Sequence, residues 1–144
     1  MDLLERARAL AACPLFADLA PAVVIRLAER ARSEALEAGE RRNTDDNVWV
    51  VVDGSFIISS RAAVAADATT STHRRHGGAA KAGNVLGLVR VVAPQTPALE
   101  AIAERASTVV GVALDDMRDV FEEDPIALAA LSDALARLLL EAAT

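Results

Sequence analysis

The chain has 144 residues, the length of one domain, and its 53% hydrophobic residues and mean hydropathy of +0.27 exclude a disordered chain. A net charge of −6 and a pI of about 4.9 disfavour binding to nucleic acid, which requires a basic surface. Apolar runs such as Val48–Val52 are far shorter than the roughly 20 residues that span a bilayer, and the acidic start does not resemble a signal peptide. With a single cysteine, Cys13, we expect one cytoplasmic domain over residues 1–144, with no membrane insertion and no nucleic-acid partner.

Two short helices are predicted within residues 2–32. Apolar residues recur at helical spacing from Asp2 to Ala12, and Pro14 ends that pattern. A second amphipathic run begins at Pro21 and extends to roughly Arg32. We therefore expect a helical N-terminal unit followed by a β-rich segment.

The strands are predicted between about residues 33 and 114. The β-branched run Val48–Val52 ends at Asp53-Gly54, a pair typical of hairpin turns, and Ser55–Ser60 is the expected returning arm. Residues 61–82 are rich in Ala, Thr, Ser and Gly, which predicts a long hairpin connection. Further strands are expected at Val89–Val92, Leu99–Ala103 and Val109–Leu114.

Two C-terminal helices are predicted at about residues 115–142. Asp115 is the expected N-cap of the first, which ends near Asp124-Pro125. The second carries more leucine than one buried face requires, so part of it is expected to contact another chain. The candidate contact residues are Leu131, Leu135, Leu138 and Leu139. Helices, then strands, then helices give an α+β order rather than alternating βαβ units.

Six short segments carry a resemblance to a known family. They are Pro14-Leu15-Phe16, Leu19-Ala20-Pro21, Ala38-Gly39-Glu40, Trp49-Val50-Val51-Val52-Asp53-Gly54, Ala82-Gly83-Asn84-Val85-Leu86-Gly87 and Leu114-Asp115-Asp116-Met117. In this order they resemble the cyclic-nucleotide-binding domain, the module of catabolite activator proteins, protein kinase regulatory subunits and gated channels. The resemblance covers almost the whole chain and implies a β-jelly-roll, as in a catabolite-activator-like sensor domain, flanked by N-terminal and C-terminal helices.

The chain departs from this family in the phosphate-binding cassette, here residues 86–99. The family's ribose-binding glutamate corresponds to Leu88, and its phosphate-binding arginine falls near Pro97. Burying a phosphate without a charge-assisted hydrogen bond is costly, so the cassette is expected to be degenerate. The family-equivalent pocket residues are Leu86, Gly87, Leu88, Arg90, Ala98 and Leu99. Arg90 is an alternative cation for a rearranged pocket, although a strand at this point would turn it away.

Other candidate chemistry is weak. His73 and His76 lack a convincing third metal ligand, and the basic cluster that they form with Arg74, Arg75 and Lys81 is typical of a solvated loop. Neighbouring aspartates such as Asp115-Asp116 are better explained by helix capping than by acid–base work. No nucleophile lies near a base, so we expect no enzyme activity, no metal and no cofactor.

These patterns favour a non-catalytic regulatory or protein-interaction module that is unable to bind cAMP or cGMP in the family manner. Its expected partner is a protein or a missing domain. A homodimer through the C-terminal helix is also expected, because the resemblance implies it: in dimeric relatives the corresponding helix mediates dimerisation. The alternative is a ligand sensor that binds an apolar or weakly polar molecule, or a cyclic nucleotide through a rearranged pocket. A metal-dependent cupin-like enzyme around His73 and His76 is a third, minor hypothesis. No helix-turn-helix follows the last helix before Thr144, so direct control of transcription is not expected.

Overall fold

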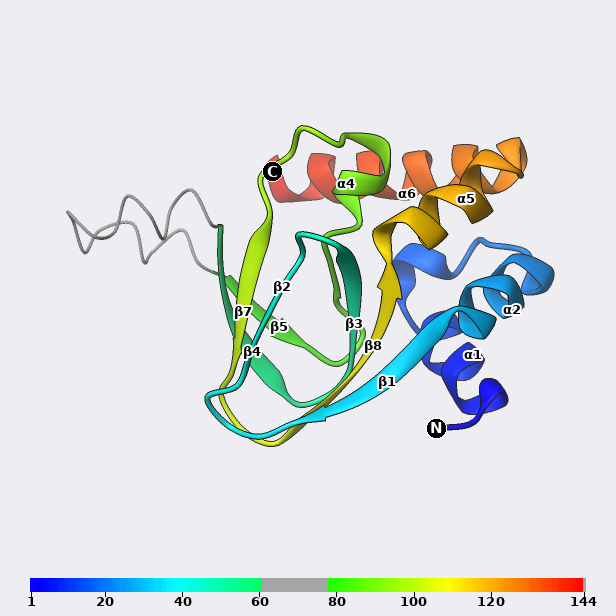
Figure 1. Ribbon diagram of the computed structural model, residues 1–144. Helices are drawn as coiled ribbons and strands as arrows, with labels where there is room; N and C mark the ends of the chain where they lie inside the picture. The colour runs from blue at the N-terminus through cyan, green and yellow to red at the C-terminus, as the bar shows by residue number, and fades with distance from the viewer. Residues whose placement is uncertain (61–77, 144) are drawn as a thin grey trace.

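A computed structural model describes residues 1–60 and 78–143 of the chain (Figure 1). The helical elements are α1 (Leu3–Ala11), the 3-10 turn η1 (Pro14–Phe16), α2 (Pro21–Glu29), α4 (Val89–Val92), α5 (Leu114–Glu122) and α6 (Pro125–Ala143). The strands are β1 (Ala31–Leu36), β2 (Arg41–Asn43), β3 (Asn47–Asp53), β4 (Ser55–Ser60), β5 (Gly78–Lys81), β6 (Val85–Leu86), β7 (Leu99–Ala103) and β8 (Ser107–Ala113). None of the helices in this part of the chain is long and apolar enough to cross a membrane.

The strands form two four-stranded antiparallel sheets. One has the order β1-β8-β3-β6 and the other β2-β7-β4-β5. Helices precede and follow the strands, and Figure 1 shows α1, α2 and α5 grouped beside β1 and β8. The predicted α+β order and β-jelly-roll are therefore confirmed.

The central strand β3 is buried on both faces. Val48 and Val50 belong to the core cluster beneath the helices, whereas Trp49 and Val51 belong to the cluster between the two sheets. Side chains alternate across a strand, so the helices cover one face of this sheet and the second sheet covers the other. A strand covered on both faces needs no polar alternation, which explains the uninterrupted apolar run of β3.

The helix boundaries follow local capping chemistry. The Asp2 carboxylate accepts a hydrogen bond from the Glu5 amide at 2.8 Å, and the Glu5 carboxylate accepts one from the Asp2 amide, which completes a capping box for α1. α2 ends at Glu29, before the expected Arg32, because the chain joins the sheet from Ala31 onward. The predicted N-cap at Asp115 is wrong: Ala113 is the N-cap, and Asp115 lies in the first turn of α5.

The predicted hairpin at Asp53-Gly54 is also wrong. β3 pairs with β8 and β6, whereas β4 pairs with β5 and β7, so the two consecutive strands lie in different sheets. Gly54 has φ +112°, and a Cβ there would lie 2.0 Å from the Ser107 Oγ atom. The glycine therefore allows a corner that carries the chain from one sheet to the other. The pairing of β4 with β5 agrees with the long hairpin connection expected over residues 61–82. Residues 61–77 of that connection lie outside the described part.

The predicted strand at Val89–Val92 is a short helix, α4. Its β-branched residues favour a strand by propensity alone. However, Gly87 adopts φ +87°, the chain turns there, and the Arg90 and Val91 amides donate to the carbonyls of Gly87 and Leu88. This tertiary setting overrides local propensity, and it changes where Arg90 points.

Candidate functional site

The cassette segment, residues 86–99, runs from β6 through α4 to the start of β7. Gly87 sits at its first turn, where a Cβ would lie 2.8 Å from the Thr44 Cβ atom. Both the positive φ of Gly87 and this close approach favour glycine at the position. The conformation of the segment is thus tied to the β2–β3 connection, which contributes Thr44.

Thr44 connects both ends of the cassette segment. Its side chain is 2% exposed, and its hydroxyl accepts a hydrogen bond from the Leu99 amide at 2.8 Å. Its own amide donates to the Leu99 carbonyl at 2.9 Å. These bonds join the loop before β3 to the start of β7, so Thr44 positions the segment. The sequence prediction missed this residue.

Arg90 lies on α4 and turns its guanidinium group inward. The Nε atom donates to the Thr96 carbonyl at 3.1 Å, and Nη1 donates to the carbonyls of Thr44 and Asp45. These three main-chain acceptors hold the end of the cassette loop against the β2–β3 connection. The prediction that strand geometry turns Arg90 away is therefore wrong, because its backbone is helical and its side chain borders the site.

The cassette segment and α6 enclose a cavity of about 160 Å³. Four of the six predicted pocket residues line it: Gly87, Leu88, Arg90 and Leu99. Leu86 instead faces the space between the sheets, and Ala98 does not line the cavity. The remaining lining residues are Leu15, Val85, Val89, Thr96, Pro97, Leu135 and Leu138. The cavity is therefore mainly apolar, with one cation at its border.

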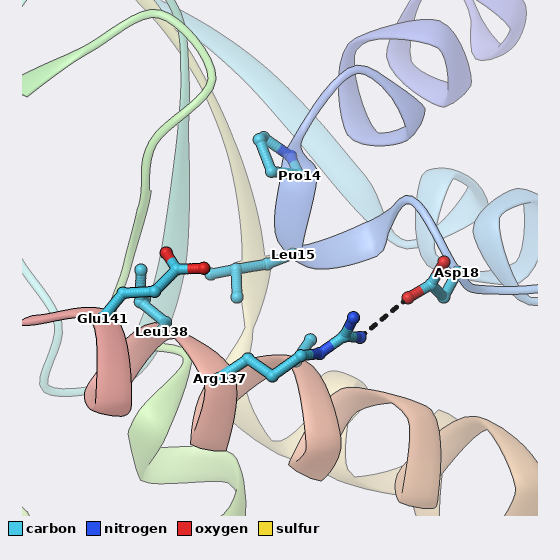
Figure 2. Close-up of a pocket in the computed structure, with 7 residues that line it drawn as sticks. Pro14, Leu15, Asp18, Arg137, Leu138 and Glu141 are labelled. Carbon is cyan, nitrogen blue, oxygen red and sulfur yellow. Dashed lines mark hydrogen bonds and ion pairs between the residues drawn. The ribbon is translucent and has the colours of Figure 1, made fainter.

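The C-terminal half of α6 covers this cavity and rests on η1. Leu138 and Leu15 line both the cavity and a neighbouring cleft of about 200 Å³ between α6 and η1. Figure 2 shows the cleft, with Arg137 directed from α6 toward Asp18, and the two groups form an ion pair at 3.0 Å. This ion pair raises the pKa of Arg137 further above its ordinary value. Leu15, Leu138 and the exposed Arg137–Asp18 ion pair thus lie where α6 crosses η1 beside the cassette.

The predicted interaction residues of α6 separate into two groups. Leu131 and Leu135 are buried in the core of the chain, at 0% and 5% exposure. Leu138 and Leu139 are exposed, as is Leu140, which is not among the predicted contact residues. The exposed leucines of α6 therefore lie in its C-terminal half.

The remaining candidate chemistry stays weak within the described residues. No group of three metal-ligating side chains occurs in residues 1–60 and 78–143, and His73 and His76 lie outside them, as do Arg74 and Arg75. Cys13 is fully buried, and its thiol donates to the Ala9 carbonyl. Burial raises the pKa of the Cys13 thiol to about 11, so it is protonated at neutral pH and poorly nucleophilic.

Comparison with known proteins identifies the fold through structure alone. No family model and no curated protein sequence matches the chain. A candidate cyclic nucleotide binding protein from Ruegeria pomeroyi matches with a TM-score of 0.70 and 16% identity, over 99% of this chain and 62% of that one. The sensor domain of the transcriptional regulator DNR from Pseudomonas aeruginosa matches with a TM-score of 0.68 and 17% identity, over 96% of this chain and 92% of that domain.

A third neighbour is the regulatory subunit of a cAMP-independent protein kinase A from Trypanosoma brucei. It matches with a TM-score of 0.62 and 15% identity, over 94% of this chain and 48% of that one. A mutant of that subunit with three substitutions, one of which introduces an arginine, is bound to cAMP in its A site. The present chain spans less than two thirds of the Ruegeria and Trypanosoma chains. Its two antiparallel sheets, its flanking helices and these likenesses together show that the chain has the fold of cyclic nucleotide-binding domains.

Proposed function

We propose that this chain is a non-catalytic regulatory or protein-interaction module that does not bind cAMP or cGMP in the manner of the family that it resembles. The observation that carries the proposal is the burial of Leu88, the residue that the resemblance aligns with the family's ribose-binding glutamate. Leu88 is 2% exposed and belongs to the core cluster beneath the helices. A residue that packs in the core offers no hydrogen bond to a sugar hydroxyl.

The charges around the cavity support the same proposal. By the resemblance, the family's phosphate-binding arginine falls near Pro97, which contributes neither a charge nor an amide hydrogen. The nearest cation, Arg90, donates three hydrogen bonds to main-chain carbonyls that hold the cassette together. An entering phosphate would compete with these bonds, so binding would weaken the structure that forms the site.

The size of the cavity adds a steric argument. Its volume of about 160 Å³ is below the roughly 300–1,000 Å³ of pockets that hold drug-sized ligands. Leu135 and Leu138 fill the space from the α6 side. The T. brucei subunit, which is named as cAMP-independent, provides a precedent for a regulatory protein with this fold.

Isothermal titration of cAMP and of cGMP into the purified protein tests the proposal. We expect no heat of binding for either nucleotide at millimolar concentration. Micromolar binding would refute the proposal. The Arg90→Gln variant, with Arg41→Gln as the matched control, would then show whether Arg90 contacts the phosphate, because Arg41 pairs with Glu100 away from the cavity.

A second candidate function is supported by the apolar lining of the same cavity. A ligand sensor would bind a small apolar or weakly polar molecule between α6 and the cassette segment. Such a ligand raises the melting temperature by binding only the folded state. A thermal-shift screen tests this function with Leu138→Trp, which narrows the cavity, and Leu139→Trp, whose side chain does not line it. A ligand whose shift persists in Leu138→Trp would bind elsewhere and contradict this assignment.

A further inference from the structure

A cleft of about 320 Å³ lies between α4, α5 and α6. α5 packs against both other helices, and Figure 1 shows the three together at one end of the two sheets. The cleft shares no lining residue with the cavity at the cassette segment. It is therefore a separate feature of the surface, which the sites described above do not use.

The bottom of this cleft is apolar. Phe121 is fully buried there, and Val91 and Leu128 pack against the core cluster beneath the helices. Val92 on α4 borders the cleft and is 41% exposed, although it is a β-branched apolar residue. Exposed apolar surface inside a polar rim is typical of a place where another chain binds.

The net charge of the chain is concentrated in α5 and the two residues that follow it. Residues 114–124 contain six carboxylates and one arginine, so this segment carries −5 of the chain's net −6. The carboxylates belong to Asp115, Asp116, Asp119, Glu122, Glu123 and Asp124. A surface with this charge attracts a positively charged partner and repels a negative one.

On the side of α5 that faces α2, the carboxylates are compensated within the chain. Arg30 of α2 pairs with Asp116 at 3.9 Å, and Arg26 pairs with Glu123. Each of these two carboxylates thus has an arginine of its own. This side of the helix offers little uncompensated charge to a partner.

On the side of α5 that borders the cleft, the carboxylates outnumber the cations. Arg118 pairs with Asp115 at 3.7 Å and also donates to a main-chain carbonyl of α4 at 3.1 Å. Glu122 lines the cleft, and Asp119 lies one turn before it. Both are exposed, and within residues 1–60 and 78–143 neither side chain has a hydrogen bond or an ion pair. The apolar cleft therefore has an acidic rim that the described chain does not neutralise.

We infer that this cleft docks a basic amphipathic segment of a partner protein. Apolar side chains of the segment would enter the cleft, and its Lys or Arg side chains would pair with Asp119 and Glu122. An amphipathic helix binds in this way, with its apolar face in a groove and its charges at the rim. The inference rests on the proposed role as a protein-interaction module and deepens it by naming the chemistry of the partner.

Fluorescence anisotropy with a labelled peptide tests the docking site. The probe is a peptide of leucine and lysine at helical spacing, and we expect saturable micromolar binding that weakens as the salt concentration rises. Two control peptides carry glutamate or glutamine in place of lysine, and a third has the leucines and lysines in scrambled order. If any control binds as tightly as the probe, the inference is overturned, because the occupant need not then be basic and amphipathic.

Charge-neutralising variants locate the binding on α5. The double variant Asp119→Asn/Glu122→Gln should raise the dissociation constant of the probe about tenfold, since it removes two exposed ion pairs. Glu37→Gln/Glu104→Gln is the matched control, because it makes the same change in net charge at exposed carboxylates that do not line the cleft. Its effect should stay within about twofold. Equal affinities of the two double variants would contradict the assignment.

A variant of the apolar wall completes the test. Val92→Ser should weaken binding about fivefold, whereas Ile57→Ser, at an exposed apolar residue of β4, should not change it. Unchanged binding in Val92→Ser overturns the inference. So does a dimer of the chain that Val92→Ser dissociates, because a second copy would then occupy the cleft. Nucleotide titration is a separate measurement: cAMP binding refutes the proposed function, whereas failure of the probe to bind overturns the docking site alone.

Discussion

Replacement of Thr44 by valine tests how the cassette segment is held. Valine has nearly the shape of threonine, so the change removes the hydroxyl that accepts a hydrogen bond from the Leu99 amide and keeps the packing against Gly87. Leaving a partly buried amide without its hydrogen-bond acceptor lowers the free energy of unfolding by about 1–3 kcal/mol. We therefore expect Thr44→Val to lower the free energy of unfolding by about that amount, even though valine is the more hydrophobic residue.

The assay is urea unfolding followed by the fluorescence of Trp49, the only tryptophan, which is buried between the sheets. Thr44→Ser keeps the hydroxyl and loses the methyl group. Thr108→Val is the matched control, because the Thr108 hydroxyl has no hydrogen bond within the described residues, and its effect should stay within about 0.5 kcal/mol.

Hydrogen exchange of the Leu99 amide separates the two effects of the substitution. Its exchange should be about 5- to 150-fold faster in Thr44→Val, which corresponds to the expected loss in free energy, and should stay close to wild type in Thr44→Ser. The reasoning is refuted if Thr44→Val is as stable as the wild type, or if the Leu99 amide keeps its protection without the hydroxyl.

Three further predictions concern other parts of the fold. Gly54→Ala should lower the free energy of unfolding by at least about 2 kcal/mol, because the new methyl group clashes with Ser107 and the positive φ is strained for alanine. Gly39→Ala is the control in parallel urea titrations: Gly39 has φ +90° and no atom within 4 Å of an added Cβ, so this substitution should show the strain alone. Burial raises the pKa of the Cys13 thiol from an ordinary 9.0 to about 11. The contribution of Cys13 to the free energy of unfolding should therefore be complete below pH 9 and should fall by about 2–3 kcal/mol as the pH rises to 11. Unfolding curves of Cys13→Ala should not show this fall. Asp2→Ala removes the capping box and should lower the free energy of unfolding by about 1 kcal/mol, which a lower melting temperature would show. An unchanged melting temperature would mean that the first turn of α1 is frayed in solution.

The sequence pattern identified the elements better than their pairing. The run Val48–Val52 marked a strand correctly because β-branched residues fit a covered sheet. The same run predicts a hairpin because Asp53-Gly54 is a frequent turn pair. Local chemistry does not determine which sheet a strand joins. At this corner Gly54 lies so close to Ser107 that no side chain fits. Because Ser107 is far along the chain, the local sequence around Gly54 does not reveal this contact.

In the candidate site, too, the local sequence predicts turns but not contacts between segments that are far apart in the chain. The landmark around Gly87 located the cassette segment correctly, because a positive φ at a turn favours glycine. Nothing local distinguishes Thr44, whose role depends on hydrogen bonds to Leu99, or predicts that Leu15 and Leu138 meet over the cavity. These contacts join segments that are distant in the sequence.

In the proposed function, the leucine at position 88 links the missing ribose contact to the stability of the fold. In the family that the chain resembles the glutamate contacts the ribose, whereas Leu88 lines the small cavity and packs in the core that the helices share with β3 and β8. Restoring the carboxylate alone would place an unpaired charge in that core, which is costly. Restoring an arginine at Pro97 alone would leave the pocket without a ribose contact. Under the proposed function, nucleotide binding would therefore require coordinated changes at both positions, together with displacement of Leu135 and Leu138. Single substitutions in the cassette should then affect stability before they affect binding.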